Sequence, residues 1–225
     1  MTAGAITAST SASPARIAGA AGVAAIALAC VGAVIAPMWD LPGTLATAAE
    51  IESFVVAERT QLLTAMTLYS IAVPLWLVFG AGVWLGMREA LGGESLLSAC
   101  FALGLVGFVT LLLAGFVPLF VLAYRAEDVA DPWLLYDLSF GLLAMSGPLT
   151  AIALGSFALA VLRARHLPAW TAYLAVVAAV AHLLLIASFR VSEGFFSLEG
   201  QVITVIPGTL FVWIAGTGIA MLARR

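Results

Sequence analysis

The sequence has no lysine, only two cysteines and two histidines, and just 9% charged residues in a chain of 225. Soluble domains carry about 25% charged residues, so this chain lacks the polar surface that a water-soluble fold of its length needs. Its net charge is −3 and it has no basic run, which disfavours nucleic acid as a partner. Histidine is too scarce for a multi-histidine metal site, so we expect neither a metal nor a cofactor.

Sequence motifs of known chemistry are also missing. The chain has no glycine-rich phosphate loop, no Gly-x-Ser-x-Gly elbow and no Cys-x-x-Cys pair. None of its apolar stretches carries a ladder of arginines, which excludes a voltage sensor, and none buries a pair of acids, which disfavours a proton-coupled pump. These absences make an enzyme the less favoured class without excluding one.

What the chain does have is apolar length, because 64% of its residues are hydrophobic. After a polar N-terminal tail at 1–15, which we expect to be disordered and cytoplasmic, residues 16–225 form a single domain. About 20 apolar residues cross a bilayer as a helix. We therefore predict an all-α, polytopic membrane bundle with six transmembrane helices, at about 17–36, 62–86, 96–122, 133–162, 169–189 and 202–222.

The arginines predict the orientation of the bundle. One set of alternating connections, together with the two chain ends, holds six of them: Arg16, Arg88, Arg163, Arg165, Arg224 and Arg225. The other connections hold three: Arg59, Arg125 and Arg190. Cytoplasmic loops carry the excess of basic residues, so both termini are predicted to be cytoplasmic. The protein is then a multi-pass protein of the bacterial plasma membrane.

The first outer connection contains a helix start signal. Thr47 and Glu50 are spaced as a capping box, in which each side chain caps the other residue's free amide. Ile51, Phe54 and Val55 then form one apolar face. We predict a short amphipathic helix at about 48–60 on the outer membrane surface, and the alternative is a plain extension of the second span.

Polar residues of the outer half form the candidate pocket. Ionisable side chains within membrane spans are costly and therefore mark functional sites by default. The bland alternatives stay open: Asp137 would be interfacial and hydrated, His182 a neutral core histidine, and Arg190 a side chain that reaches back to the interface. The candidate pocket residues are Asp137, His182, Arg190, Gln201, Tyr136 and Ser139.

A polar stripe supports an outward-facing polar pocket. Tyr136, Ser139, Ser146 and Thr150 recur at helical spacing along the fourth span. If the stripe faces inward, it lines a cavity that is open to the outside. The alternative is that serine and threonine hydroxyls bond to the backbone of their own helix, which would leave no polar cavity.

Small residues predict where helices approach one another closely. Gly82 and Gly86 are one turn apart on the second span, and Gly216 and Ala220 on the sixth. Such pairs allow close backbone contact in lipid. They are first of all seams of the bundle, and second a face for a homo-oligomer or a partner membrane protein.

Three functions are consistent with these features. The favoured one is a non-enzymatic bundle that binds or transports a small solute or a lipid through an outward polar pocket. The second is an accessory subunit that packs on a partner through its small-residue faces. The third is a membrane-embedded enzyme acting on a lipid or an isoprenoid, with Asp137 and His182 as acid and base.

Three segments carry a resemblance to known sequences: WDLPG at 39–43, LYDLSFG at 135–141 and GFFSLEG at 194–200. With them the chain resembles a group of uncharacterised actinobacterial integral membrane proteins of the domain-of-unknown-function kind. The resemblance implies a six-helix fold and no known activity, so it assigns no functional residue.

Overall fold

The computed structural model describes residues 13–36 and 39–223, and within them the fold is entirely helical. Six helices are long and apolar enough to cross a membrane, which confirms the predicted fold class of a multi-pass helical membrane protein. Most of the predicted N-terminal tail lies outside the described residues. The helices are α1 Pro14–Ile35, α2 Ala48–Ala57, α3 Arg59–Leu91, α4 Leu96–Arg125, α5 Pro132–Ala164, α6 Ala169–Leu184 and α7 Val202–Leu222, with 3₁₀ turns η1 Ala126–Asp128 and η2 Leu185–Arg190.

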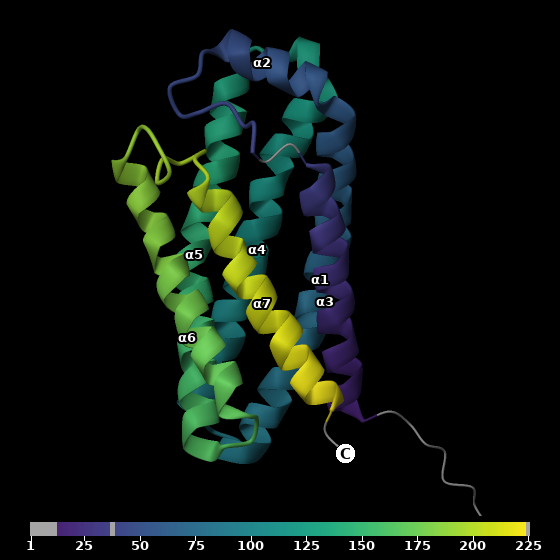
Figure 1. Cartoon of the computed structure of the whole chain (residues 1–225), viewed down its shortest axis with the longest axis vertical. Helices are drawn as coiled ribbons and strands as arrows, with labels where there is room; N and C mark the ends of the chain where they lie inside the picture. Colours follow the sequence, from purple (N-terminus) through teal and green to yellow (C-terminus); the bar gives the residue numbers. More distant parts are fainter. Residues whose placement is uncertain (1–12, 37–38, 224–225) are drawn as a thin grey trace, which may run out of the picture.

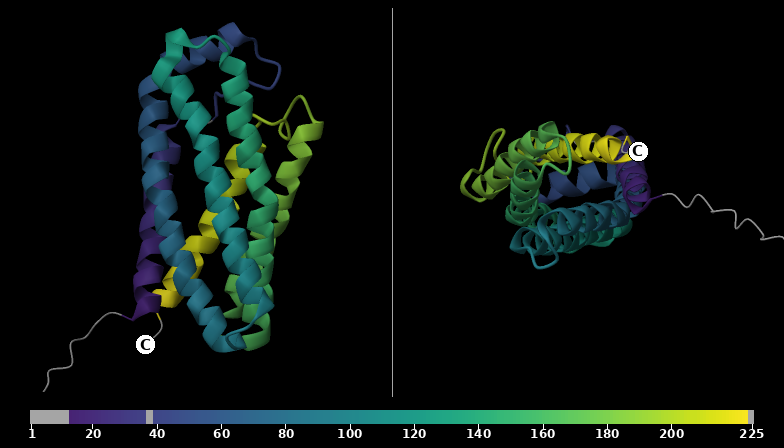
Figure 2. Two further views of the ribbon diagram at one scale, coloured as in Figure 1. Left: turned by 180° about the vertical axis from the view of Figure 1, so that it is seen from behind. Right: turned by 90° about the horizontal axis from the view of Figure 1, so that it is seen from below.

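The six long helices form a closed ring. Each packs on its neighbour in the order α1, α3, α4, α5, α6, α7 and back to α1, and the view along the bundle shows this ring (Figure 2). The start of α1 and the finish of α7 lie together at one end (Figure 1), which we call the termini end; the opposite one is the α2 end. An even number of crossings follows, whereas the side of the membrane that the termini face remains a prediction.

Helix α2 lies across the α2 end of the bundle (Figure 1). Its capping box is formed as expected, and the hydrogen bond from the Thr47 backbone amide lowers the pKa of Glu50. Its apolar residues Ile51 and Val55 are buried. Because α2 packs on α3, α4 and α5, that face meets protein rather than lipid. A turn at Glu58 separates it from α3, so it is not a plain extension of the second span.

Helices α3 and α5 are longer than a bilayer requires. Each has 33 residues, which span about 50 Å at 1.5 Å per residue, against about 30 Å of hydrocarbon. Helix α1 has only 22 residues. The longer helices therefore rise past the end of α1, and α2 covers the part that projects (Figure 1).

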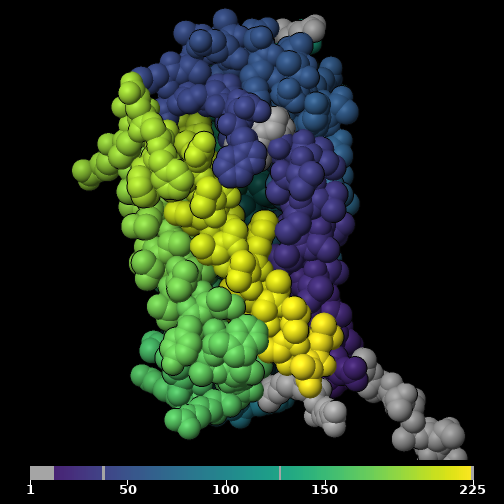
Figure 3. Space-filling model, in the orientation of Figure 1, coloured from purple at the N-terminus to yellow at the C-terminus, as the bar shows by residue number. Residues whose placement is uncertain are grey.

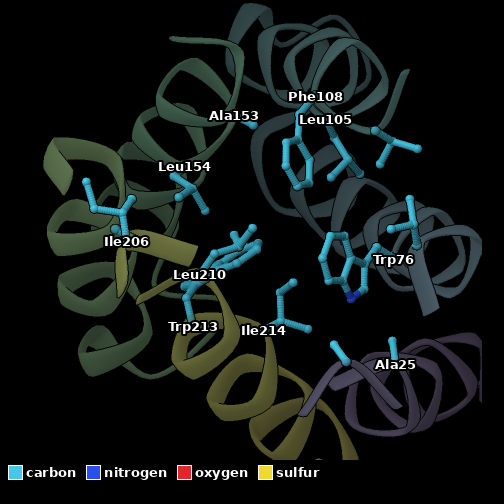
Figure 4. Packing of buried hydrophobic residues seen from close by; sticks show 14 of the residues in the cluster. Ala25, Trp76, Leu105, Phe108, Ala153, Leu154, Ile206, Leu210, Trp213 and Ile214 are labelled. Atoms are coloured by element: carbon cyan, nitrogen blue, oxygen red, sulfur yellow. The ribbon is translucent and has the colours of Figure 1, made fainter. Parts of the chain in front are cut away.

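An aromatic core fills the middle of the ring (Figure 4). The indole of Trp213 makes edge contacts with Phe79 and Phe157, at centroid distances of 5.5 and 5.1 Å. Trp76 stacks on Phe108 with centroids 5.7 Å apart. These two tryptophans are buried, which explains why they fall at mid-membrane depth and not in the interfacial belt that tryptophan usually occupies.

Two of the predicted small residues, Gly82 and Gly216, lie in close seams of the ring, whereas a methyl group on Gly86 would be no closer than 4.0 Å to its nearest neighbour, His166. A methyl group on Gly82 would lie 2.1 Å from Cβ of Ala18 on α1, and one on Gly216 would lie 2.8 Å from the ring of Trp170 on α6. Ala220 is buried as well. These contacts are within the chain, so the use of the same faces for a partner stays a prediction.

Candidate functional site

A cavity of about 280 Å³ lies inside the ring, in the half nearer the α2 end. All six long helices contribute to its wall, and the wall is mostly aromatic and aliphatic. Protein interiors are normally close-packed, and an apolar cavity of roughly 150 Å³ already accommodates a molecule such as benzene. The aromatic side chains of the wall are Trp39, Tyr69, Trp76, Phe108, Phe116, Phe140 and Phe211.

The cavity opens sideways, between α1 and α7. These helices touch at the termini end, where Gly19 and Gly218 meet, and they diverge toward the α2 end (Figure 1). The molecular surface is hollowed between them there (Figure 3). Ala33 and Trp39 line one side of the cavity at this gap, and Pro207 and Gly208 of α7 line the other. Because both helices span the membrane, the gap faces lipid.

The aromatic core closes the cavity toward the termini end. Trp76, Phe108 and Leu210 line the cavity and also belong to the packed layer beneath it, where they meet Phe79 and Trp213. The free space remaining in that layer is only about 10 Å³, which is no more than a single water molecule needs. The cavity is therefore a blind chamber in this conformation and not a passage across the bundle.

The cavity wall has few polar groups, and two of them donate their proton to a backbone carbonyl of their own helix. Nδ1 of His182 lies 2.8 Å from the carbonyl oxygen of Ala178, and the Ser146 hydroxyl donates to the carbonyl of Leu143 at 2.6 Å. A carbonyl oxygen only accepts, so Nδ1 carries the ring proton and Nε2 of the neutral ring is an acceptor. His182 and Ser146 therefore present acceptors to the cavity.

The structure separates the six predicted pocket residues. Only His182 among them lines the cavity. Arg190 and Gln201 are exposed. Ser139 is buried in the seam between α4 and α5, where it donates to the carbonyl oxygen of Gly115 at 2.6 Å. The six residues thus do not form one shared pocket.

Tyr136 and Asp137 belong to a second, polar cluster at the α2 end. The Tyr136 hydroxyl donates to the carbonyl oxygen of Pro42 at 3.0 Å, and the Thr44 hydroxyl donates to Oε2 of Glu199. The carboxyl groups of Asp137 and Glu199 lie close enough to influence each other electrostatically. The cluster therefore ties together the loop after α1, the start of α5 and the loop before α7.

Glu199 is the residue of this cluster that sequence reasoning missed. It is only 3% exposed, and its Oε1 has no donor among the described residues. Two ionised carboxylates only accept, so a hydrogen bond between Glu199 and Asp137 requires one of the two to be protonated. Burial first, and then the charge of Asp137, raise the pKa of Glu199, although the Thr44 hydrogen bond opposes this. Because Glu199 lies in a polar loop of the sequence, nothing in the sequence indicated that it is buried.

Asp137 and His182 are too far apart to act together. Gly147 of α5 packs directly on the carbonyl group of His182. Asp137 is ten residues earlier on the same helix, which corresponds to about 15 Å along its axis. Direct proton transfer needs hydrogen-bonding reach. The acid–base pair that motivated the enzyme hypothesis is therefore not formed.

The expected polar pocket is instead an apolar cavity. The stripe residues bond to backbone carbonyls: Ser139 to Gly115, Ser146 to Leu143, and Thr150 to Ser146 at 2.9 Å. This is the alternative in which hydroxyl groups satisfy helix backbone. A helix-spacing pattern shows that these residues share a face but not whether that face meets a cavity or another helix.

Among the described residues, no group of three histidine, cysteine or acidic side chains is close enough together to hold a metal ion. Cys30 and Cys100 are free thiols. Searches of protein-family models, of curated proteins and of solved structures find no match to this chain.

Proposed function

We propose that this protein binds an apolar, lipid-like molecule inside its ring of helices. The observation that carries the proposal is the blind cavity of about 280 Å³, whose wall is mostly aromatic and aliphatic. A molecule that enters from lipid leaves surroundings as apolar as this wall, so its binding would come from van der Waals contacts with side chains that otherwise face empty space. A polar solute would lose its hydration there with few groups to replace it.

The route to the cavity supports a ligand that arrives from the membrane. The gap between α1 and α7 faces lipid, and Trp39 stands at its edge with 63% of its surface exposed. With the orientation predicted from the arginines, the gap lies in the outer leaflet of the bacterial plasma membrane. The closed aromatic layer below favours binding over passage to the other side.

Gly208 gives a direct test, because a side chain added there would project into open space next to the cavity. Gly208→Phe is expected to fill the cavity and abolish binding of radiolabelled farnesol, a representative lipid-soluble probe, to protein in lipid nanodiscs. Gly155→Phe is the matched control, since Gly155 is also a helical glycine with open space around its Cβ position but does not line the cavity.

The control variant is expected to bind the probe like the wild type. Equal binding by wild type and Gly208→Phe would place any bound lipid on the outer surface and refute the proposal. A wild type that binds neither farnesol nor any of a panel of hydrocarbons, fatty alcohols and quinones would refute it as well.

A further inference from the structure

The cavity wall also selects for one chemical group on its ligand. We infer that the ligand is a lipid-soluble alcohol whose hydroxyl group donates a hydrogen bond to Nε2 of His182. This inference rests on the proposed function, since it concerns the molecule that occupies the same cavity.

The side chain of His182 is held in one tautomer by its own helix. The residue is 2% exposed, and its Nδ1–H is committed to the carbonyl oxygen of Ala178 one turn earlier on α6. Within the described residues the hydrogen bond of this side chain is made by Nδ1, and the side chain lines the cavity. Nε2 is therefore available to accept a hydrogen bond from a ligand hydroxyl.

The neighbouring wall reinforces the same preference. Ser146 on α5 lines the cavity beside the point where Gly147 packs on the backbone of His182. Its proton is given to the carbonyl of Leu143, so its oxygen can only accept from the cavity side. Beside His182 and Ser146, a ketone or ether oxygen of the ligand would meet only acceptors, whereas a hydroxyl group offers a proton to them.

The arrangement of the cavity wall fits an alcohol with an apolar body. His182 and Leu185 belong to the part of the wall formed by α6 and η2, next to α7 and across the ring from α3, and the gap lies between α1 and α7. A hydroxyl at His182 therefore places the hydrocarbon chain against the aromatic residues of α3 and α4. The remaining chain can leave through the gap into the lipid.

Farnesol and farnesyl methyl ether separate the hydroxyl effect from apolar binding. The two share the chain and the oxygen, and only farnesol has a proton to donate. In nanodiscs, wild-type protein is expected to bind farnesol about tenfold more tightly than the ether, the factor that corresponds to 1.4 kcal/mol. Equal affinities would overturn this inference while leaving the proposed function in place, and no binding of either would count against both.

Two variants locate the preference at His182. His182→Phe keeps a ring but has no acceptor, so its farnesol and ether affinities are expected to become equal. His182→Gln retains an acceptor and is expected to keep part of the preference. A tenfold preference that survives in His182→Phe would overturn the inference. Each measurement is a ratio within one variant, so a change in the folded fraction does not affect it, and the wild-type comparison stands if a variant fails to fold.

Discussion

Gly19 on α1 and Gly218 on α7 lie in direct backbone contact, so close that a methyl group on Gly19 would be 2.7 Å from the carbonyl oxygen of Gly218. In lipid, such close approach is a main source of helix association. The contact fixes the two helices at the termini end and leaves them free to diverge at the other. The same pair of residues therefore closes the ring and sets the apex of the gap that leads to the cavity.

The first prediction tests this contact. Gly19→Ala is expected to destabilise the bundle by about 1–3 kcal/mol, because its methyl group must displace backbone. Gly155→Ala is the control, since open space surrounds its Cβ position. There alanine should be neutral or stabilise by up to about 1 kcal/mol. Thermal unfolding midpoints in detergent measure both, and equal midpoints would show that the glycine contact does not hold α1 and α7 together.

The second prediction concerns the loop after α1, which carries Trp39. Tyr136→Phe removes the hydrogen bond to the carbonyl of Pro42 and leaves that carbonyl oxygen without this donor. A net loss of about 1 kcal/mol in unfolding free energy is expected. Tyr173→Phe is the control, because Tyr173 is 61% exposed on α6. A loss of the same size in both variants would contradict an anchoring role for Tyr136.

The third prediction is a pH dependence from Glu199. Burial and the charge of Asp137 raise the pKa of this carboxyl above its ordinary value. The folded protein then binds more protons than the unfolded chain between the two pKa values. Stability is therefore full below the unfolded pKa and is lost as pH rises through the raised folded pKa.

Glu199→Gln is expected to flatten this part of the stability profile. The amide oxygen still accepts from Thr44, and the amide group donates to Asp137 without any titration. The melting midpoint at neutral pH should rise relative to wild type. Glu193→Gln, an exposed position in the same loop, is the control. An unchanged slope in Glu199→Gln would show that Glu199 does not hold its proton more tightly in the folded state.

The fourth prediction fixes the orientation in the membrane. In a variant without Cys30 and Cys100, a single cysteine replaces either Glu50 on α2 or Gly93 between α3 and α4; both positions are exposed. A membrane-impermeant maleimide added to intact cells is expected to label Glu50→Cys and not Gly93→Cys until the cells are opened. The reverse pattern would overturn the orientation predicted from the arginines.

The features that could be predicted from the sequence are those set by the type of a residue and by its spacing from its neighbours. The Thr47–Glu50 capping box forms because both partners are three residues apart on one helix turn. His182 was singled out as an ionisable group within a span, and it does line the cavity. The contact considered between His182 and Asp137 is not formed, because helix ends predicted from a sequence give the depth of a residue only approximately. On α5, ten residues separate Asp137 from Gly147, the residue that packs on His182.

The aromatic wall gave no sequence signal. Trp76 and Phe108 are apolar residues in apolar helices, and nothing in their spacing distinguishes a residue that faces lipid from one that faces a cavity. In water the hydrophobic effect makes that distinction through periodicity, but lipid is as apolar as the core. The burial of Glu199 also had no sequence signal, since it depends on contacts with residues far away in the sequence, such as Thr44 in the first loop.

The amino-acid sequence by itself determined that this chain crosses a membrane as six helices, because the length and apolarity of each run decide that step before any helix meets another. The tertiary structure alone decided that the helices close into a ring, that α1 and α7 diverge from the contact of Gly19 with Gly218, and that a cavity with a mostly apolar wall remains inside the ring. The physical reason is that helix packing in lipid depends on shape complementarity between neighbouring surfaces, and shape exists only once the helices are assembled.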